Sequence, residues 1–198
     1  MNLPNKLTVF RIILVPIMVI IPYLQIEGEM FSIPITWLLV NLIFIIASIT
    51  DKLDGYIARS RNQVTTFGKF LDPIADKILV LAAMIMLVAD GRLPAWIPII
   101  VVFREFLVSG YRLIEVEHSG KVVAASMWGK LKTVTQMIGL IVAFIDVNSF
   151  GAFFGGSLSG FSLVLNIVST VTIFVSVVAT IFSGWDYLKN GKDLLKDM

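Results

Sequence analysis

Four aspartates, Asp51, Asp54, Asp72 and Asp76, lie within 26 residues of otherwise apolar sequence. Moving an ionised carboxylate out of water costs several kcal/mol, so such a cluster normally implies bound cations, paired bases or a wet cavity. On helices, the first pair is separated by about 60° and the second by about 40°, so each pair lies on one face. Oxygen-only ligands suit Mg²⁺ or Mn²⁺, held as one ion or as a pair about 3.5 to 4 Å apart. The spacing therefore predicts a divalent metal site with these four aspartates as ligands.

Small and basic residues accompany the aspartates. Gly55 and Ala58 keep one helix face open for a substrate, although small residues are also common at ordinary contacts between membrane helices. Arg59 either binds a phosphate group or neutralises the carboxylates. These alternatives are not separated by spacing alone.

A purely structural explanation of the aspartates is a set of salt bridges that holds a helical hairpin together. The candidate partners are Lys52, Arg59, Lys69 and Lys77. Four acids on facing helix surfaces exceed what such pairing needs, and ionisable groups inside membrane segments normally have a function. The metal site is therefore the preferred hypothesis.

The elements that must position these residues are apolar helices. The chain is 57% hydrophobic with a mean hydropathy of +0.89, well above a soluble domain. Apolar runs near the length needed to cross a bilayer recur along the chain. The pattern predicts an all-α integral membrane protein, with residues 1–198 forming a single domain. Six spans are expected, at about 7–26, 33–50, 68–88, 94–113, 127–145 and 161–182.

Composition excludes several other kinds of site. Without cysteine there is no disulfide, thiolate metal site or cysteine nucleophile, and His118 is the only histidine, which excludes zinc sites of the histidine type. The net charge of +2 is too small to indicate nucleic acid. Arg11 interrupts the first apolar run, which argues against a cleaved signal peptide.

Basic residues are distributed unevenly across the expected topology. Six spans put both termini on one side, and 15 of the 16 lysines and arginines fall on that side, leaving only Arg92 opposite. This asymmetry assigns both termini to the cytoplasm. The four aspartates lie at cytoplasmic ends of spans, so the active surface is expected to face the cytoplasm.

The motif around the aspartates resembles a known family. Its fixed residues fit the signature DxxDGxxARx8GxxxDxxxD of the CDP-alcohol phosphatidyltransferases at every position and spacing, and they are Asp51, Asp54, Gly55, Ala58, Arg59, Gly68, Asp72 and Asp76. The resemblance implies a six-helix membrane enzyme that moves a phosphatidyl group, or a phosphoalcohol, from a CDP-linked donor to an acceptor hydroxyl.

The resemblance also implies roles for individual residues. Asp51, Asp54 and Asp72 would bind metal, with two Mg²⁺ or Mn²⁺ ions expected, and Asp76 would lie near the metals as the general base. The CDP-diacylglycerol site would comprise Asn5, Thr8, Asp54, Gly55, Ala58, Arg59 and Gly68. Without the family, Thr8 would be interpreted as a helix-capping or first-turn residue.

Weaker features concern the acceptor. The segments NLPNKLTVFRIILVPI, FGKFLDPIADK, REFLVSGYR and WGKLKT resemble bacterial members that make phosphatidylglycerophosphate from sn-glycerol 3-phosphate, with release of CMP. A cluster of Arg104, Arg112, Lys130 and Lys132 would then bind the acceptor phosphate, although single cations at such positions also extend to lipid headgroups. Glu105 either orients Arg104 or forms a structural ion pair. The alternative acceptors are inositol phosphate or serine.

The expected surroundings follow from the same resemblance. The enzyme would lie among membrane phospholipids as a multi-pass protein of a bacterial cell membrane, would form a homodimer and would not bind nucleic acid. A divalent-cation transporter is the alternative from another class, but it leaves the glycines and Arg59 at their spacing unexplained. A purely structural membrane subunit is disfavoured for the same reason.

Overall fold

The computed structural model describes residues 2–60, 65–119 and 126–190. Six helices account for most of the described chain, which confirms the all-α prediction. They are α1 (Leu3–Ile20), α2 (Ile35–Ser60), α3 (Thr66–Ala89), α4 (Trp96–Ser119), α5 (Met127–Ile145) and α6 (Gly160–Asn190). Short 3₁₀ turns η1 (Ile21–Leu24) and η2 (Ala152–Gly155) and a two-stranded hairpin, β1 (Glu29–Met30) with β2 (Ile33–Pro34), complete the described elements.

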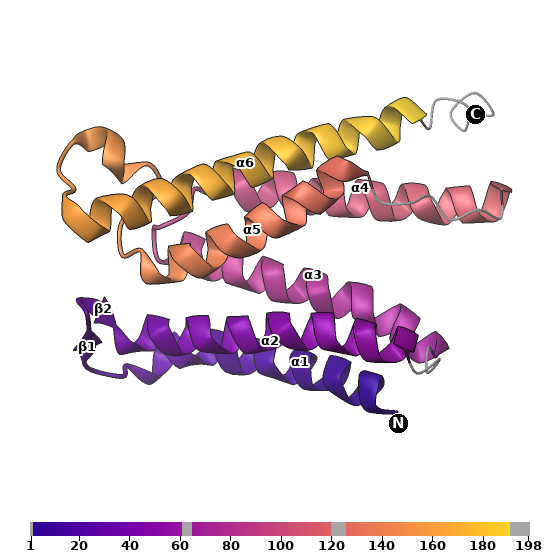
Figure 1. Ribbon diagram of the computed structural model, residues 1–198, viewed down its shortest axis with the longest axis horizontal. Helices are drawn as coiled ribbons and strands as arrows, with labels where there is room; N and C mark the ends of the chain where they lie inside the picture. Colours follow the sequence, from indigo (N-terminus) through magenta and orange to yellow (C-terminus); the bar gives the residue numbers. More distant parts are fainter. Residues whose placement is uncertain (1, 61–64, 120–125, 191–198) are drawn as a thin grey trace.

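The helices run along one long axis (Figure 1), with α1 beside α2 and α5 beside α6. Helix α3 lies between these pairs and contacts α1, α2, α4 and α5. The start of α1 and the end of α6 lie at the same end of the bundle, which is termed the polar end below; the β1–β2 hairpin lies at the opposite, outer end. Helix α3 is therefore placed to carry side chains toward both halves of the molecule.

Local sequence explains where the helices begin. The side chain of Asn2 caps α1 by accepting from the backbone N–H of Asn5, and a proline stands in the first positions of this helix. Helix α1 therefore begins at Leu3, earlier than the predicted residue 7. Helix α5 begins after Ser126, which accepts from the N–H of Gly129, and its bounds agree with the predicted span.

Two details of the prediction are wrong. The β1–β2 hairpin was not expected, because two-residue strands are too short to show an alternating pattern. Its turn residues Phe31 and Ser32 both have positive φ, 56° and 61°. The fourth span was predicted to begin at about residue 94, but α4 begins at Trp96.

Four segments are long and apolar enough to cross a membrane: Leu3–Leu24, Ile35–Ile57, Met127–Ile145 and Gly160–Lys189. The outward faces of several helices expose large apolar side chains, such as Phe106 at 73% and Ile99 at 65%. Such surfaces are unusual in soluble monomers. The protein is therefore a membrane protein. Four of the six predicted spans coincide with described helices that are long and apolar enough to cross a bilayer, and the total of six spans stays a prediction.

An aromatic core joins α2 to α5 toward the outer end. Phe144 stacks on Trp37 with ring centroids 6.0 Å apart and meets Phe44 edge-on at 5.6 Å. Arg92, in the turn between α3 and α4, lies 4.1 Å above the Trp37 ring. It also forms an ion pair with Asp90.

The same arginine caps the C-terminus of helix α5. Its Nη1 donates to the carbonyls of Ala143, Phe144 and Asp146 at 3.4, 3.2 and 3.1 Å. The last carbonyls of a helix have no partner within the helix, so this cation satisfies them. Arg92 thus connects α2, the α3–α4 turn and α5 at the outer end.

The contact between α5 and α6 depends on Gly139. A Cβ at this position would lie 2.7 Å from Ile173 Cγ1 and 3.1 Å from the backbone N of Ile173. We expect Gly139→Ala to destabilise the protein by about 1 to 3 kcal/mol, because the backbone of α6 would have to move. Thermal unfolding in detergent would measure this loss.

Gly110 on α4 is the matched control, since a Cβ there meets nothing within 4 Å. Gly110→Ala should leave stability unchanged or raise it slightly through helix propensity. Equal effects of the two substitutions would contradict the packing role of Gly139.

Candidate functional site

A polar stripe on α1 faces the aspartates of α2 and α3. Asn5, Thr8 and Arg11 follow one another at intervals of three residues and are buried, with 7%, 2% and 0% of their surface exposed. This spacing places them on one helix face. Buried polar groups need partners, and the partners here come from the signature segment.

Thr8 links the acids of two helices. Its hydroxyl oxygen lies 2.7 Å from Asp72 Oδ1, 3.4 Å from Asp54 Oδ2 and 3.2 Å from the carbonyl of Pro4. A hydroxyl has one proton, and the shortest contact shows that Thr8 donates to Asp72. One carboxylate of α2 and one of α3 therefore converge on one α1 side chain.

Arg11 holds the two acids of α2. Its Nη2 donates to Asp54 Oδ2 at 2.5 Å, and its Nη1 lies 2.6 Å from Asp51 Oδ1 as an ion pair without hydrogen-bond geometry. The Arg11 side chain is 0% exposed, Asp54 is 4% exposed and Asp51 is 38% exposed. The buried charge of Asp54 is therefore compensated by a buried guanidinium.

The N-terminus of α3 explains the glycine of the signature. Thr65 caps the helix by accepting from the N–H of Gly68 at 3.0 Å, and its own hydroxyl donates to Asn5 Oδ1 at 3.0 Å. A Cβ at Gly68 would lie 2.9 Å from the same Asn5 oxygen. Gly68 therefore allows α1 to approach the start of α3. The side chains of Ala58 and Arg59 lie outside the described part of the structure.

The aspartates of α2 and α3 and the hydroxyl of Thr8 can be compared with the ligands that a divalent metal ion prefers. All the donors are carboxylate or hydroxyl oxygens, as a hard divalent cation requires, and Arg11 shows that Asp51 and Asp54 can share one positive group. Among the described residues, no three acidic or histidine side chains lie close enough together to hold one ion. The residues thus fit such an ion in kind, and a centre formed by all four aspartates stays a prediction.

Asp76 lines a cavity of about 320 Å³ between α3, α4 and α5. The polar side chains in its lining are Asp76, Lys77, Glu105, Ser109, Lys132, Thr133 and Gln136. The rest of the lining is apolar, as in most small-molecule sites. The cavity brings the last aspartate of the signature together with Lys77 of the same helix and Lys132 of α5.

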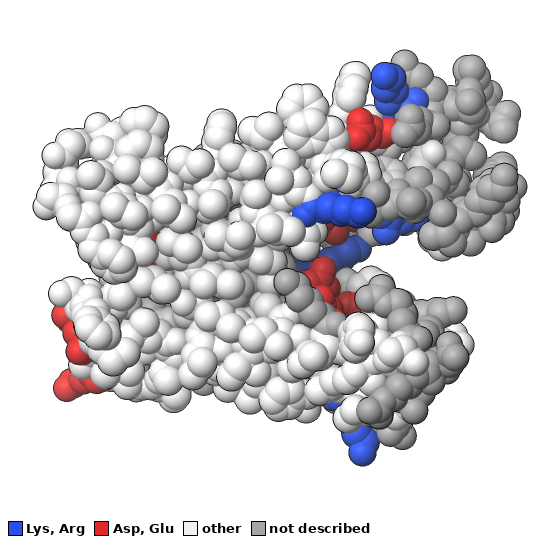
Figure 2. Space-filling model, viewed as in Figure 1, with Lys and Arg blue, Asp and Glu red and all other residues white. Residues whose placement is uncertain are grey.

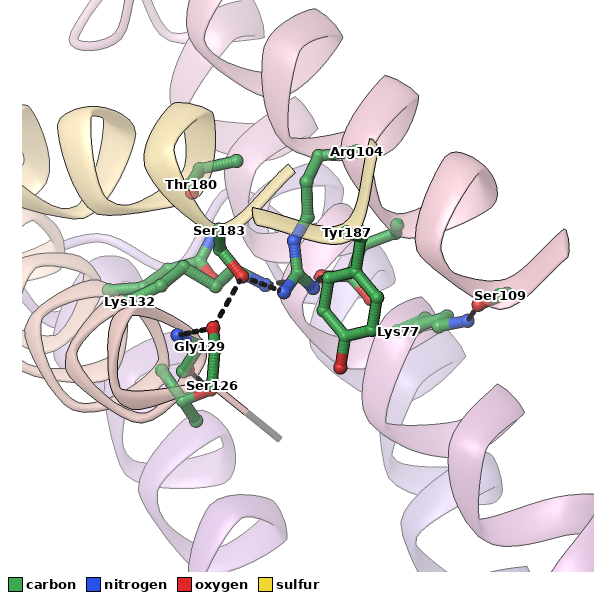
Figure 3. Close-up of polar contacts among 12 residues, drawn as sticks. Lys77, Arg104, Ser109, Ser126, Gly129, Lys132, Thr180, Ser183 and Tyr187 are labelled. Carbon is green, nitrogen blue, oxygen red and sulfur yellow. Dashed lines mark hydrogen bonds and ion pairs between the residues drawn. The ribbon is translucent and has the colours of Figure 1, made fainter. Parts of the chain in front are cut away.

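Glu105 organises two of the predicted cations. Its Oε1 accepts from Lys132 Nζ at 2.6 Å and from Arg104 Nη1 at 3.0 Å. Arg104 also donates to Ser183 of α6, which in turn lies 3.4 Å from Ser126, the N-cap of α5 (Figure 3). These contacts fix Arg104 and Lys132 on one carboxylate.

The other two predicted cations are placed differently. Arg112 donates to the hydroxyl of Tyr187 at 2.6 Å, and Lys130 is exposed. Neither belongs to the cavity lining, and Arg104 does not either, so Lys132 is the one cation of the predicted cluster that lines it. The structure therefore does not bring all four cations into one pocket.

Two residues at the site were not predicted to take part in it. Arg11 was used only to judge the first span, although its spacing from Asn5 and Thr8 was visible in the sequence. Lys77 was considered only as a salt-bridge partner of the aspartates, but it lines the cavity and donates to Ser109 at 2.5 Å. Its position directly after Asp76 was the available signal.

Charged groups gather toward the polar end of the bundle (Figure 2), where acidic and basic side chains meet in a hollow. The fold and the site together define an α-helical membrane protein with a charged site among its helix ends. The family description CDP-alcohol phosphatidyltransferase matches residues 1–183. The chain belongs to this family, whose members generally depend on a divalent metal ion.

Curated relatives are similar over nearly the whole chain. A protein of Bacillus subtilis is 43% identical, covering 98% of this chain and 97% of its own. A protein of Haemophilus influenzae is 38% identical, and the match covers 99% of this chain and 96% of the relative. A protein of Rickettsia bellii is 36% identical, and the match covers 95% of this chain and 94% of the relative. Each of the three is named CDP-diacylglycerol--glycerol-3-phosphate 3-phosphatidyltransferase.

Proposed function

We propose that this protein transfers the phosphatidyl group from CDP-diacylglycerol to sn-glycerol 3-phosphate, giving phosphatidylglycerophosphate and CMP. The observation that carries the proposal is the cavity that joins Asp76 to Lys77 and Lys132. Such a pocket suits a small acceptor that carries both a hydroxyl and a phosphate, because Asp76 can act as the base for the hydroxyl while the lysines bind the phosphate. The relatives named for this reaction support the choice.

The enzyme would lie in a bacterial inner membrane as one domain, residues 1–198, with six spans and both termini in the cytoplasm. The described helix ends support this arrangement, because the start of α1 and the end of α6 lie at the same end of the bundle. The basic side chains visible in Figure 2 lie toward that end, as the positive-inside rule requires for a cytoplasmic face. A homodimer is proposed from the family resemblance.

CDP-diacylglycerol would bind at the polar end, where α1 meets the signature segment. Asn5 and Gly68 are in close approach there, and Thr8 contacts Asp54 and Asp72. Gly55, Ala58 and Arg59 would complete this site on α2. The acyl chains would remain in the lipid beside the helices.

Asp51, Asp54, Asp72 and Asp76 would hold Mg²⁺ or Mn²⁺, with two ions proposed. When bound, such ions neutralise the charge of the diphosphate and make CMP a better leaving group. Thr8 would keep Asp72 oriented through the hydroxyl it donates, and Arg11 would keep Asp51 and Asp54 together.

The reaction is a direct displacement at phosphorus. Asp76 takes the proton of the acceptor hydroxyl, whose oxygen forms a bond to the phosphorus next to diacylglycerol. The bond from that phosphorus to the oxygen of CMP breaks, and CMP leaves with the electron pair. Arg104 and Lys132, paired here with Glu105, would bind the acceptor phosphate. Arg112 and Lys130 lie outside the cavity lining, so their contact with the acceptor phosphate stays a prediction.

An acceptor panel tests the proposal. The purified protein, labelled CDP-diacylglycerol and Mg²⁺ would be combined separately with sn-glycerol 3-phosphate, inositol phosphate, serine or glycerol. We expect release of CMP and formation of labelled lipid with glycerol 3-phosphate, at a kcat/KM at least about 100-fold above serine and glycerol, because the cavity offers cations that only a phosphate can use. Inositol phosphate carries the same group, so its arm of the panel tests the shape of the acceptor and not its charge. Preference for inositol phosphate or serine would overturn the acceptor assignment but keep the reaction class.

A further inference from the structure

Lys77 differs from the other cations near the cavity in its partners. Within the described part of the chain, its Nζ contacts the neutral hydroxyl of Ser109 and forms no ion pair. Lys132 and Arg104 share the carboxylate of Glu105. The positive charge of Lys77 is therefore the one that the cavity wall leaves uncompensated by direct contact.

The position of this charge relative to Asp76 also matters. Both residues line the cavity from consecutive positions of α3, while Ser109 holds the ammonium group from α4 (Figure 3). A three-carbon acceptor carries its reacting hydroxyl and its phosphate at opposite ends of a short chain. A cation beside the base can contact that phosphate while the hydroxyl stays at Asp76.

Asp76 and Glu105 also line the cavity, but among the described residues neither forms an ion pair with Lys77, whose ammonium group contacts a neutral oxygen instead. A hydroxyl satisfies one of its three N–H donors, whereas a phosphate dianion can accept from it as a charged group. The arrangement is thus more favourable with a bound phosphate than without one, and it discriminates against acceptors that lack this group.

We infer that Lys77 is a specificity-determining residue. When the acceptor binds, the ammonium group of Lys77 exchanges its contact with Ser109 for one with the acceptor phosphate. It thereby selects phosphorylated over unphosphorylated alcohols. This inference rests on the proposed transfer reaction and adds a residue to it. Ser109 serves as a positioning residue that holds the ammonium group in the cavity while the acceptor site is empty.

The test compares Lys77→Met with wild type in steady-state transfer, varying glycerol 3-phosphate and CDP-diacylglycerol separately. We expect the KM for glycerol 3-phosphate to rise at least about 10-fold and the KM for CDP-diacylglycerol to stay within about 2-fold. Inorganic phosphate, which should compete with the acceptor in wild type, should inhibit the variant at least about 10-fold more weakly. Lys77→Arg should restore most of the affinity for both phosphate compounds.

Lys189→Met is the matched control, because it removes an exposed lysine of α6 to which no part in the site is assigned; it should behave as wild type. An unchanged KM for glycerol 3-phosphate in Lys77→Met, or equal rises for both substrates, would overturn the inference. If Lys77→Met does not accumulate in membranes, Lys77→Gln repeats the comparison with a polar side chain. Wild type that fails to use glycerol 3-phosphate would instead refute the proposed acceptor.

Discussion

Asp76→Asn is expected to lower kcat for phosphatidyl transfer by about 10³-fold, the loss typical when a general base is removed. An amide cannot take the proton of the acceptor hydroxyl, while it keeps the size of the side chain in the cavity that Asp76 lines. Steady-state CMP release, measured with saturating concentrations of both substrates, would show the effect.

The control for this substitution is Asp186→Asn on α6, which makes the same chemical change at a position with no assigned part in the reaction. It should keep kcat within about 2-fold of wild type. If Asp76→Asn retained a kcat within a few-fold of wild type, another group would have to accept the proton. If it lost binding of CDP-diacylglycerol as well, the effect would come from the proposed part of Asp76 in metal binding and not from its part as a base alone.

Arg11→Met is expected to cost about 3 kcal/mol of stability when divalent metal is absent, because it leaves the buried carboxylate of Asp54 without its guanidinium. The exposed side of Asp51 reduces its own share of this cost, since water already solvates it. Thermal unfolding in detergent with a chelator would measure the loss.

Adding Mg²⁺ to millimolar concentration tests whether metal ions can replace the charge that Arg11→Met removes, and so reduce its loss of stability. If the proposed metal ions use Asp51 and Asp54, they supply positive charge to the same carboxylates, and the difference between Arg11→Met and wild type should shrink. Arg11→Lys keeps the charge but not both contacts, and it should fall between the two. A loss that is equal with and without Mg²⁺ would mean that metal ions do not replace the charge of Arg11 at these carboxylates.

Much of the fold could be predicted because its helices are long and apolar. Helix α5 agrees with its predicted bounds, since Ser126 gives a clear cap and the apolar run ends at Asp146. Helix α1 begins earlier than its apolar run, because Asn2 and Pro4 define a helix start that hydropathy does not detect. The β1–β2 hairpin was missed since its strands are two residues long.

The site was predictable within each helix and less so between helices. The spacing of Asp51 and Asp54 indicated one face of α2, but it could not indicate that Arg11 would reach both from α1. Likewise, Lys77 and Lys132 are both lysines near the acids, and only packing shows that one is paired with Glu105 while the other meets a hydroxyl. Helical periodicity gives directions around a single axis, whereas ion pairs depend on how several axes pack together.

Arg92 gives the two ends of the bundle different mechanical properties. Its contacts with Trp37, Asp90 and the last carbonyls of α5 fasten three parts of the chain at the outer end. At the polar end, α1, α2 and α3 are joined through Thr8 and Arg11, whose partners are acids that the proposed chemistry also needs. We therefore expect the outer end to act as a fixed pivot, so that helix movements during substrate entry and product release grow toward the polar end.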